Sequence, residues 1–434
     1  MNNPLSYMLD LHKHAGDAHP RGLTSVCSAH PLVIEAALIE ARDHDVIACI
    51  EATCNQVNQD GGYTGMTPAD FRGFVLRIAE KVDYPAEQIL FGGDHLGPNP
   101  WKKLPAEEAM AKAEIMTSAY ASAGFGKIHL DASMSCADDP SPLPVATIAA
   151  RAARLARSAE EGARAGNHQP PGYIIGTEVP IPGGAMEEID DLQVTTPQDA
   201  AQTVAIHKQA FQELGLSGVY DRVAGLVVQP GVEFGNANVI RFDPQAAAEL
   251  SDWRPGAEHI VFEAHSTDYQ PDAALRELVI GGFCILKVGP GLTFAMREAF
   301  YGLDRIAGIL LNEYEDGALM RAMEQIMLSS PENWDGYYAG SDTEKYVQRH
   351  FSYSDRIRYY WTDPAAQAAV DRLFDALGER HLPEPLISQF LPRLYDDVSA
   401  GRIVPTARNL TIAAIRKALL PYSRACRIEG PSAA

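Results

Sequence analysis

Short apolar segments and longer amphipathic segments alternate along the first three quarters of the chain. Eight apolar segments span residues 22–28, 46–51, 89–91, 127–131, 173–178, 223–229, 259–265 and 284–288. Such nearly continuous apolar runs are typical of strands that are buried on both faces. The stretches between them have helical spacing, most clearly at 31–41, 68–80, 106–122, 145–165, 197–214 and 292–311. Several open with a helix-start signal, such as Thr67-Pro68 and Thr196-Pro197, since proline is favoured in the first helical turn.

Eight strand–helix units in succession predict a parallel sheet covered by helices, and their number favours a closed (β/α)8 TIM barrel. An open doubly wound sheet is the structural alternative. It is disfavoured because the first strand–helix turn, Ser28-Ala-His-Pro31, lacks the GxGxxG phosphate loop of nucleotide-binding sheets.

The last part of the chain has a different character. Residues 313–434 contain helix-like blocks with aromatic and basic residues, and no apolar run comparable to the earlier ones. We therefore predict a barrel over residues 1–312 and a helical C-terminal extension, 313–434, packed on it. Within the extension, residues 352–358 are a candidate for reaching over the barrel mouth.

Composition narrows the class of protein. The 434 residues carry a formal net charge of −21 without a Lys/Arg run, so neither nucleic acid nor an anionic membrane is an expected partner. The sequence has no run of about 18 apolar residues, so no membrane span is predicted. The N-terminus has no signal-peptide pattern, so none is expected. The six cysteines are scattered, which favours free thiols and a cytoplasmic location.

Polar residues stand at the predicted C-terminal ends of most strands, where TIM barrels carry their active sites. The clearest case is Asp94-His95, which directly follows the apolar run 89–91 and two glycines. The others are Ser28, His30, Glu51, Asn55, Asp131, Glu178, Gln229, Glu233, His265, Asp268 and Lys287. An isolated Asp-His pair can simply cap the next helix. Repetition on nearly every strand end instead predicts one shared site at the barrel axis.

A metal site is the first candidate within this set. His95 and His265 follow strands that are four apart, so they face each other across the mouth, and Glu178 could complete a His/His/carboxylate group. Such ligands suit a divalent metal, zinc first and manganese second. The competing interpretation of His265 is a hydrogen-bonded core histidine. Asp94, Glu51 and Glu178 are the candidate catalytic carboxylates.

Substrate contacts are predicted from the remaining strand ends. The loop 51–63 is rich in amides and ends in a glycine turn, so Asn55 and Gln56 are candidates for binding sugar hydroxyls. Gln229, Asp268 and Lys287 are the other candidates. Lys287 suits Schiff-base chemistry, phosphate binding or structural ion pairing, and the backbone of 289–291 could bind an anion. No GxxxxGK[ST] motif is present, so ATP-dependent kinase chemistry is not expected.

Several longer motifs carry a family resemblance over nearly the whole chain. They lie at 51–59, 61–68, 92–99, 176–180, 228–235 and 262–268. On these motifs the chain resembles the non-catalytic subunit family of class II D-tagatose-1,6-bisphosphate aldolase, which has also been labelled as a tagatose-6-phosphate kinase family. The resemblance implies a TIM barrel that supports the activity and stability of a separate catalytic aldolase chain.

The chain is also similar, more distantly, to the catalytic class II aldolases. Their Asp-His pair, their fifth-strand Glu and their later His ligand correspond to Asp94-His95, Glu178 and His265. Where those enzymes carry a His-Gly ligand on the sixth strand, this chain reads Gln229-Pro230-Gly231. The difference implies altered zinc binding and argues against independent aldolase activity.

Two functions follow as hypotheses. The first is a stabilising subunit of a class II D-tagatose-1,6-bisphosphate aldolase in ketohexose breakdown, with a catalytic aldolase chain as partner. The second is a metal-dependent 4-epimerase of a ketohexose or ketose phosphate, in which Asp94 acts as base. Retro-aldol cleavage followed by re-addition would invert C4. The sequence leaves open the sugar, its phosphorylation, the metal and the oligomeric state, a homo-oligomer included.

Overall fold

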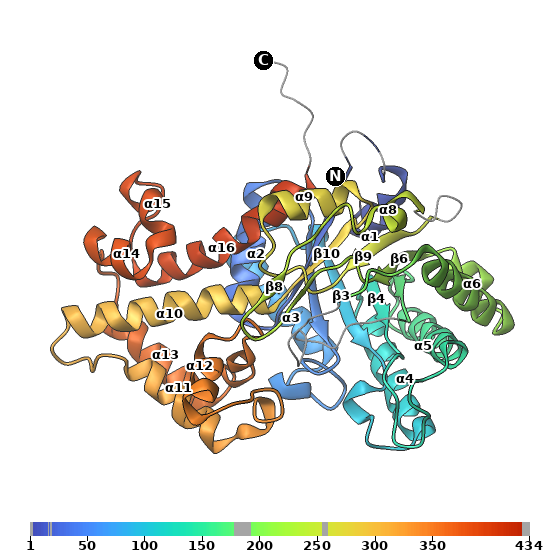
Figure 1. The fold of residues 1–434 in the computed structure, drawn as a ribbon, viewed down its shortest axis with the longest axis horizontal. Coiled ribbons are helices and arrows are strands. Elements are labelled where there is room, and N and C mark those ends of the chain that lie inside the picture. Colours follow the sequence, from blue (N-terminus) through green and yellow to red (C-terminus); the bar gives the residue numbers. More distant parts are fainter. Residues whose placement is uncertain (1–2, 16, 18–19, 178–191, 254–258, 428–434) are drawn as a thin grey trace, which may run out of the picture.

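Eight parallel strands close into a barrel in the computed structural model, which describes residues 3–15, 17, 20–177, 192–253 and 259–427 (Figure 1). The order around the barrel is β1-β10-β9-β6-β5-β4-β3-β2. The barrel strands are β1 (Leu23–Cys27), β2 (Ala48–Thr53), β3 (Ile89–Leu96), β4 (Lys127–Leu130), β5 (Gly172–Ile175), β6 (Val223–Val228), β9 (Val261–Ala264) and β10 (Ile285–Val288). The TIM-barrel prediction is therefore confirmed.

Six helices follow the strands where the amphipathic segments predicted them, and a seventh covers residues 272–280, where no helix had been predicted. They are α2 (Pro31–Asp43), α3 (Pro68–Lys81), α4 (Ala106–Ser122), α5 (Val145–Ala165), α6 (Pro197–Glu213), α9 (Asp272–Ile280) and α10 (Pro290–Leu310). Short elements complete this part: α7 (Ser217–Tyr220), α8 (Ala248–Trp253) and the hairpin of β7 (Glu233–Phe234) and β8 (Val239–Ile240). The Thr67-Pro68 signal begins α3, and Thr67 and Asp70 form a capping box there, which satisfies the free N–H groups of the first turn.

The end of the barrel formed by the N-terminal ends of the strands is apolar and closed. The N-terminal helix α1 (Pro4–Leu9) contacts β3, β5 and β6. Met8 and the following Leu11 pack with interior residues such as Leu90 and Cys284. Because hydrocarbon fills this end of the interior, a polar ligand can reach the barrel axis from the opposite end, at the C-terminal ends of the strands.

The C-terminal region is helical, as predicted. It comprises α11 (Ala318–Ser329), α12 (Asp342–Phe351), α13 (Pro364–Leu377), α14 (Glu384–Phe390), α15 (Tyr395–Ser399) and α16 (Ala407–Cys426), with a 3-10 helix at Arg356–Tyr360. In Figure 1, α10 runs outward from the barrel and α11 to α15 gather along it. The division of the chain at residue 312 stays a prediction.

The last helix returns to the barrel. α16 packs against α2, α9 and α10. Arg408 pairs with Glu35, and Arg416 with Glu40, at 2.7 and 2.9 Å, so two ion pairs fasten α16 to α2. Because α10 points away from the barrel, α16 supplies cover between α9 and α2. The extension is thus part of the layer of helices around the barrel.

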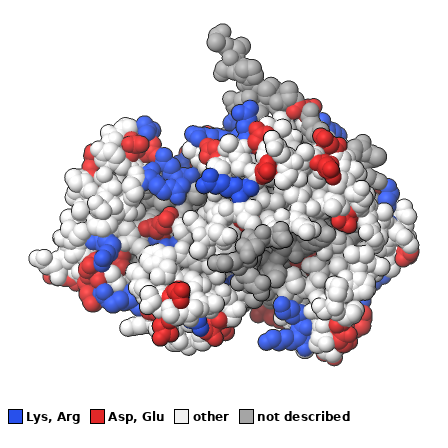
Figure 2. Space-filling view, in the orientation of Figure 1, with Lys and Arg blue, Asp and Glu red and all other residues white. Residues whose placement is uncertain are grey.

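The surface gives few clues to partners. None of the helices in the described ranges is long and apolar enough to cross a membrane. Acidic and basic side chains are interspersed on the face shown in Figure 2.

Ile415, a fully buried residue of α16, tests whether this helix is part of the barrel core. We expect Ile415→Ala to lower the free energy of unfolding by about 2–5 kcal/mol, because it leaves a cavity. Leu328→Ala, at a position that is 53% exposed, is the control and should change it by less than about 0.5 kcal/mol. Urea unfolding measures both. Equal effects of the two substitutions would show that α16 is not needed for the core.

Buried histidines generate a pH prediction. Burial lowers the pKa of His207, on α6, to about 4. Between pH 6.5 and 4 the unfolded chain then binds a proton at this side chain that the folded chain does not, so stability must fall as the pH falls through this window. The contribution is about 1.4 kcal/mol per pH unit. His207→Leu should reduce the slope of unfolding free energy against pH by that amount. Replacing the exposed His381 should not, and equal slopes for both variants would contradict the prediction.

Candidate active site at the C-terminal ends of the strands

A cavity lies at the open end of the barrel, where the sequence predicted a site. Its lining includes Asn55, Gln56, Asp94, His95, His265, Asp268 and Lys287, together with Cys27, Thr53, Tyr63, Phe234, Ser266, Val288, Gly289, Pro290, Arg358 and Tyr359. Arg358 and Tyr359 come from the C-terminal extension, so the segment that begins at residue 352 does reach the barrel mouth. Glu178 lies outside the described residues.

Strand alternation places further polar side chains inside the barrel. In β4 and the residue after it, Lys127, His129 and Asp131 are two residues apart and therefore share a face. Glu263 and His265, at β9, follow the same rule. All five are buried. The sequence analysis did not select Lys127, His129 or Glu263, although the alternation of polar and apolar residues was a signal that could have found them.

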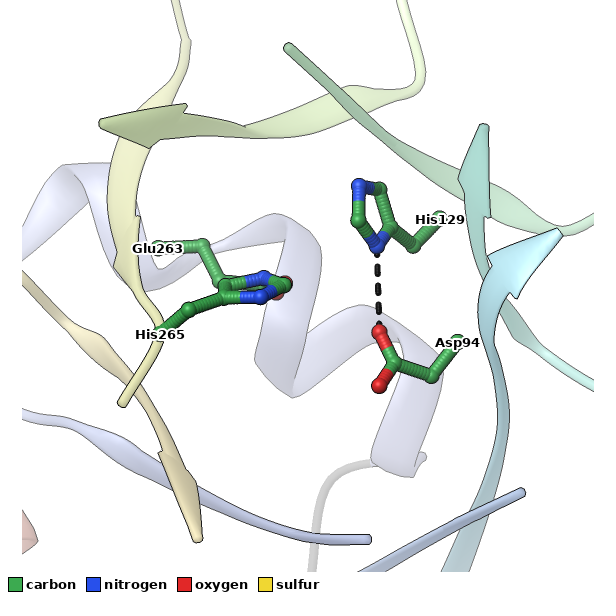
Figure 3. A group of neighbouring side chains, drawn as sticks. All are labelled: Asp94, His129, Glu263 and His265. Atoms are coloured by element: carbon green, nitrogen blue, oxygen red, sulfur yellow. Dashed lines mark hydrogen bonds and ion pairs between the residues drawn. The ribbon is translucent and has the colours of Figure 1, made fainter. Parts of the chain in front are cut away.

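Four of these side chains form a group that could hold a metal ion. One donor atom each of Asp94, His129, Glu263 and His265 lies within 4.8 Å of every other. Figure 3 shows Glu263 and His265 on one strand facing Asp94 and His129, which come from neighbouring strands. His129 Nδ1 lies 3.0 Å from Asp94 Oδ1 and 3.2 Å from the backbone nitrogen of His95, and His265 Nε2 lies 2.8 Å from Glu263 Oε1.

His95 adds a third imidazole to the same space. Its ring centroid lies 5.0 Å from those of His129 and His265, which are 5.2 Å from each other. Its Nδ1 is hydrogen-bonded to Asp131 Oδ2 over 2.8 Å, the carboxylate–imidazole arrangement that orients metal-binding histidines. The backbone of His95 has a φ of +50°, an uncommon conformation for a residue with a side chain. Strain of this kind is concentrated at functional sites.

The donors fit a divalent cation. His129 Nε2 is buried and has no hydrogen-bond partner in the described part of the chain, and it belongs to a group of donors that could bind a metal ion. Burial lowers the pKa of His265 to about 4, which keeps that ring in the neutral form that binds metals. Burial acts to lower the pKa of His95, but the carboxylates of Asp94 and Asp131 have the larger effect, and the pKa is raised. These carboxylates therefore favour a positive charge at the site. Imidazole and carboxylate donors together suit zinc or manganese.

An ion-pair network fills the barrel interior beside this cluster. Lys127 Nζ lies 2.6 Å from Glu51 Oε1 and 2.7 Å from Glu263 Oε2. Lys287 Nζ lies 2.8 Å from Asp94 Oδ1 and also pairs with Glu51. Burial would raise the pKa of Glu51, but both lysines lower it. The predicted catalytic residue Glu51 is thus fully buried between two cations, where it holds them in place.

Asp94 is ionised in this setting. Burial alone would raise its pKa, but the charges of His95 and Lys287 and the hydrogen bond from His129 hold it well below the usual value. Asp94 therefore offers a carboxylate to the cavity at neutral pH, and this carboxylate can accept a proton from a hydroxyl group once a ligand displaces part of the network.

Two other predicted substrate-binding residues, Gln229 and Asp268, already accept hydrogen bonds from the protein backbone. Gln229 Oε1 accepts hydrogen bonds from the N–H groups of Gly231 and Val232 over 2.8 and 2.9 Å. Asp268 Oδ1 accepts from Gly289 and Gly291 over 3.0 and 2.7 Å. The backbone of 289–291, a predicted anion site, thus already binds a carboxylate. Lys287 makes structural ion pairs, one of the three roles predicted for it.

Comparisons with known proteins identify the family and agree with this fold. The model of the family described as "D-tagatose-1,6-bisphosphate aldolase subunit GatZ/KbaZ-like" matches residues 8–427. A protein of Agrobacterium fabrum named D-tagatose 6-phosphate 4-epimerase is 52% identical over 406 residues, which are 94% of this chain and 95% of that protein. A crystal structure from Sinorhizobium meliloti 1021, described as a "probable tagatose 6 phosphate kinase", is 56% identical with a TM-score of 0.87. The match covers 94% of this chain and all of that one.

The family predicted from the sequence motifs is therefore confirmed over nearly the whole chain. With its barrel, its interior cluster and its helical extension, the chain belongs to the D-tagatose-1,6-bisphosphate aldolase subunit family of the GatZ/KbaZ-like type.

Proposed function

We propose that this family member is a metal-dependent 4-epimerase that interconverts D-tagatose 6-phosphate and D-fructose 6-phosphate. The observation that carries the proposal is the buried group of Asp94, His129, Glu263 and His265 at the barrel mouth, where neighbouring charges hold the pKa of Asp94 well below its usual value. The 52% identity to a protein named as a tagatose 6-phosphate epimerase supports the choice of substrate. The sequence contains no GxxxxGK[ST] phosphate-binding loop of a kinase.

His95, His129 and His265 would hold the metal, with carboxylates of Asp94 or Glu263 nearby. We propose zinc, with manganese as the alternative, and Glu178 remains a proposed additional ligand. A bound divalent ion would polarise the ketone at C2 of the sugar and so stabilise negative charge that develops there. His129, from β4, provides the imidazole that the sixth strand lacks at Gln229.

Inversion at C4 follows from proton transfer by Asp94. Its carboxylate takes the proton of the C4 hydroxyl, and the C3–C4 bond breaks to give an aldehyde at C4 and a three-carbon enediolate. The enediolate then adds to the other face of the aldehyde, and the proton returns from Asp94 to the C4 oxygen. Atoms and charge balance without an oxidant. Asn55 and Gln56, which line the same cavity as Asp94, would hold the sugar hydroxyls.

The family description supports the aldolase-subunit role that the sequence motifs predicted, and that role stands beside the proposed catalysis. We propose that the chain also associates with a catalytic class II aldolase in the cytoplasm, where a ketose phosphate would be their common ligand. The free state of all six cysteines supports that compartment. The two roles are compatible, since a partner chain can be stabilised by contacts that do not involve the residues of the barrel mouth.

His129→Ala tests the metal site. We expect at least about tenfold weaker binding of zinc, because an imidazole donor is lost and Asp94 loses its hydrogen bond. His207→Ala is the matched control, since His207 is equally buried but lies on α6, and it should bind metal as the unmodified protein does. Metal content after dialysis and a zinc competition titration measure the difference. Unchanged affinity in the His129 variant would remove His129 from the site.

Asp94→Asn tests the catalytic assignment. We expect the rate of interconversion of the two ketohexose phosphates to fall by about 10²–10⁴-fold, since an amide cannot take up the hydroxyl proton. Asp316→Asn, at an exposed position in the extension, should leave the rate unchanged.

The assay also separates the two candidate functions. A purified chain that is inactive alone, yet raises the activity of a cognate class II aldolase, would contradict the epimerase proposal and leave the subunit role.

A further inference from the structure

Arg358 stands where the active-site cavity meets a larger one. The adjoining cavity, of about 710 Å³, lies between the start of α2 and helix α13 of the extension. The two cavities share the lining residues Cys27, Gln56, Tyr63, Gly289 and Arg358. A ligand whose reacting carbons reach Asp94 would therefore extend past Arg358 toward the larger cavity.

Arg358 carries a charge that no acidic side chain neutralises by a direct ion pair in the described ranges. Among the described lining residues of the active-site cavity, Lys287 and Arg358 are the only lysine and arginine. Lys287 is paired with Glu51 and Asp94. The nearest acidic residue in sequence, Asp355, instead binds Thr293 Oγ1 over 2.6 Å and Arg297 Nε over 3.2 Å.

The guanidinium group is nevertheless held in a fixed position. Its Nη1 donates to the carbonyl oxygens of Ser354 and Asp355, and its Nη2 donates to Tyr359 Oη over 2.9 Å. The group also lies 4.4 Å from the centre of the Tyr359 ring. Three such bonds leave two of its five N–H donors for a ligand. A planar, preorganised pair of donors matches the oxygens of a phosphate group.

The other anion-binding features near the cavity are already used. The N-terminus of α10, a usual place for a phosphate in barrels, is occupied by the carboxylate of Asp268. Arg408 also lines the larger cavity, but both of its terminal nitrogens bind Glu35, at 2.9 and 2.7 Å. Arg358 is thus the described cation best placed to take a phosphate.

We propose that Arg358 binds the phosphate group of the sugar, so that the C-terminal extension distinguishes phosphorylated from free ketoses. The inference rests on the proposed function for the identity of the sugar, but the anion site itself does not depend on catalysis.

The test compares the variants R358Q and R358K with R408Q as the matched control. In calorimetric titrations of the full-length protein with inorganic phosphate, R358Q should bind at least about tenfold more weakly, because a charged hydrogen-bonding partner is lost. R358K should lie between R358Q and the unmodified protein, since lysine keeps the charge without the paired donors. R408Q should bind as the unmodified protein does. Equal phosphate affinity in R358Q and the unmodified protein, or a loss confined to R408Q, would overturn the inference.

Kinetics then separate this inference from the proposed function. R358Q should lose at least about tenfold more of kcat/KM for D-tagatose 6-phosphate than for free D-tagatose. If phosphate binding depends on Arg358 but the unmodified protein does not interconvert the sugars, the anion site stands and the epimerase fails. If the protein interconverts them and R358Q retains the same preference for the phosphorylated sugar, the epimerase stands and the role of Arg358 fails.

Discussion

The ion pairs inside the barrel are the interaction on which the site depends. Lys127, Lys287, Glu51, Glu263 and Asp94 are all removed from water, and charges so deeply buried are tolerated only when they are paired closely. Each charged side chain therefore restricts the position of the oppositely charged side chain on the strand that it pairs with. Because Glu263 and Asp94 belong both to this network and to the candidate metal group, the same charges that fill the barrel also fix its ligands.

The rest of the fold can be understood as support for this interior. At the N-terminal ends of the strands, α1 and the side chains of Met8 and Leu11 close the barrel with hydrocarbon. At the C-terminal ends of the strands, the extension supplies Arg358 and Tyr359 to the mouth, and Asp355 anchors that segment to Thr293 and Arg297 on α10. The extension thus contributes to the site as well as to the helical layer that α16 completes.

Much of the fold was predictable because buried parallel strands are apolar throughout and helices carry start signals such as Thr67-Pro68. Asp94-His95 was predictable because a polar pair follows an apolar run there. His129 and Glu263 were missed because they lie within segments that were assigned as apolar strands, where only the two-residue alternation distinguishes an inward-facing polar side chain. The pairing of Glu51 with two lysines depends on contacts between distant strands, which no local pattern contains. Arg358 lies in the segment 352–358, which was predicted as a candidate for reaching over the barrel mouth, but no pattern in the sequence singled out this residue.

The family match and the site geometry address different parts of the function. Membership in the aldolase-subunit family is established over nearly the whole chain, whereas a stabilising role alone gives no reason for three imidazoles to converge around an ionised aspartate. X-ray diffraction at the zinc absorption edge, on crystals grown with zinc, is the most direct measurement of that convergence. We predict one anomalous peak within bonding distance of His129 and His265. A peak located away from these rings, or none at all, would contradict the existence of a metal-dependent active site.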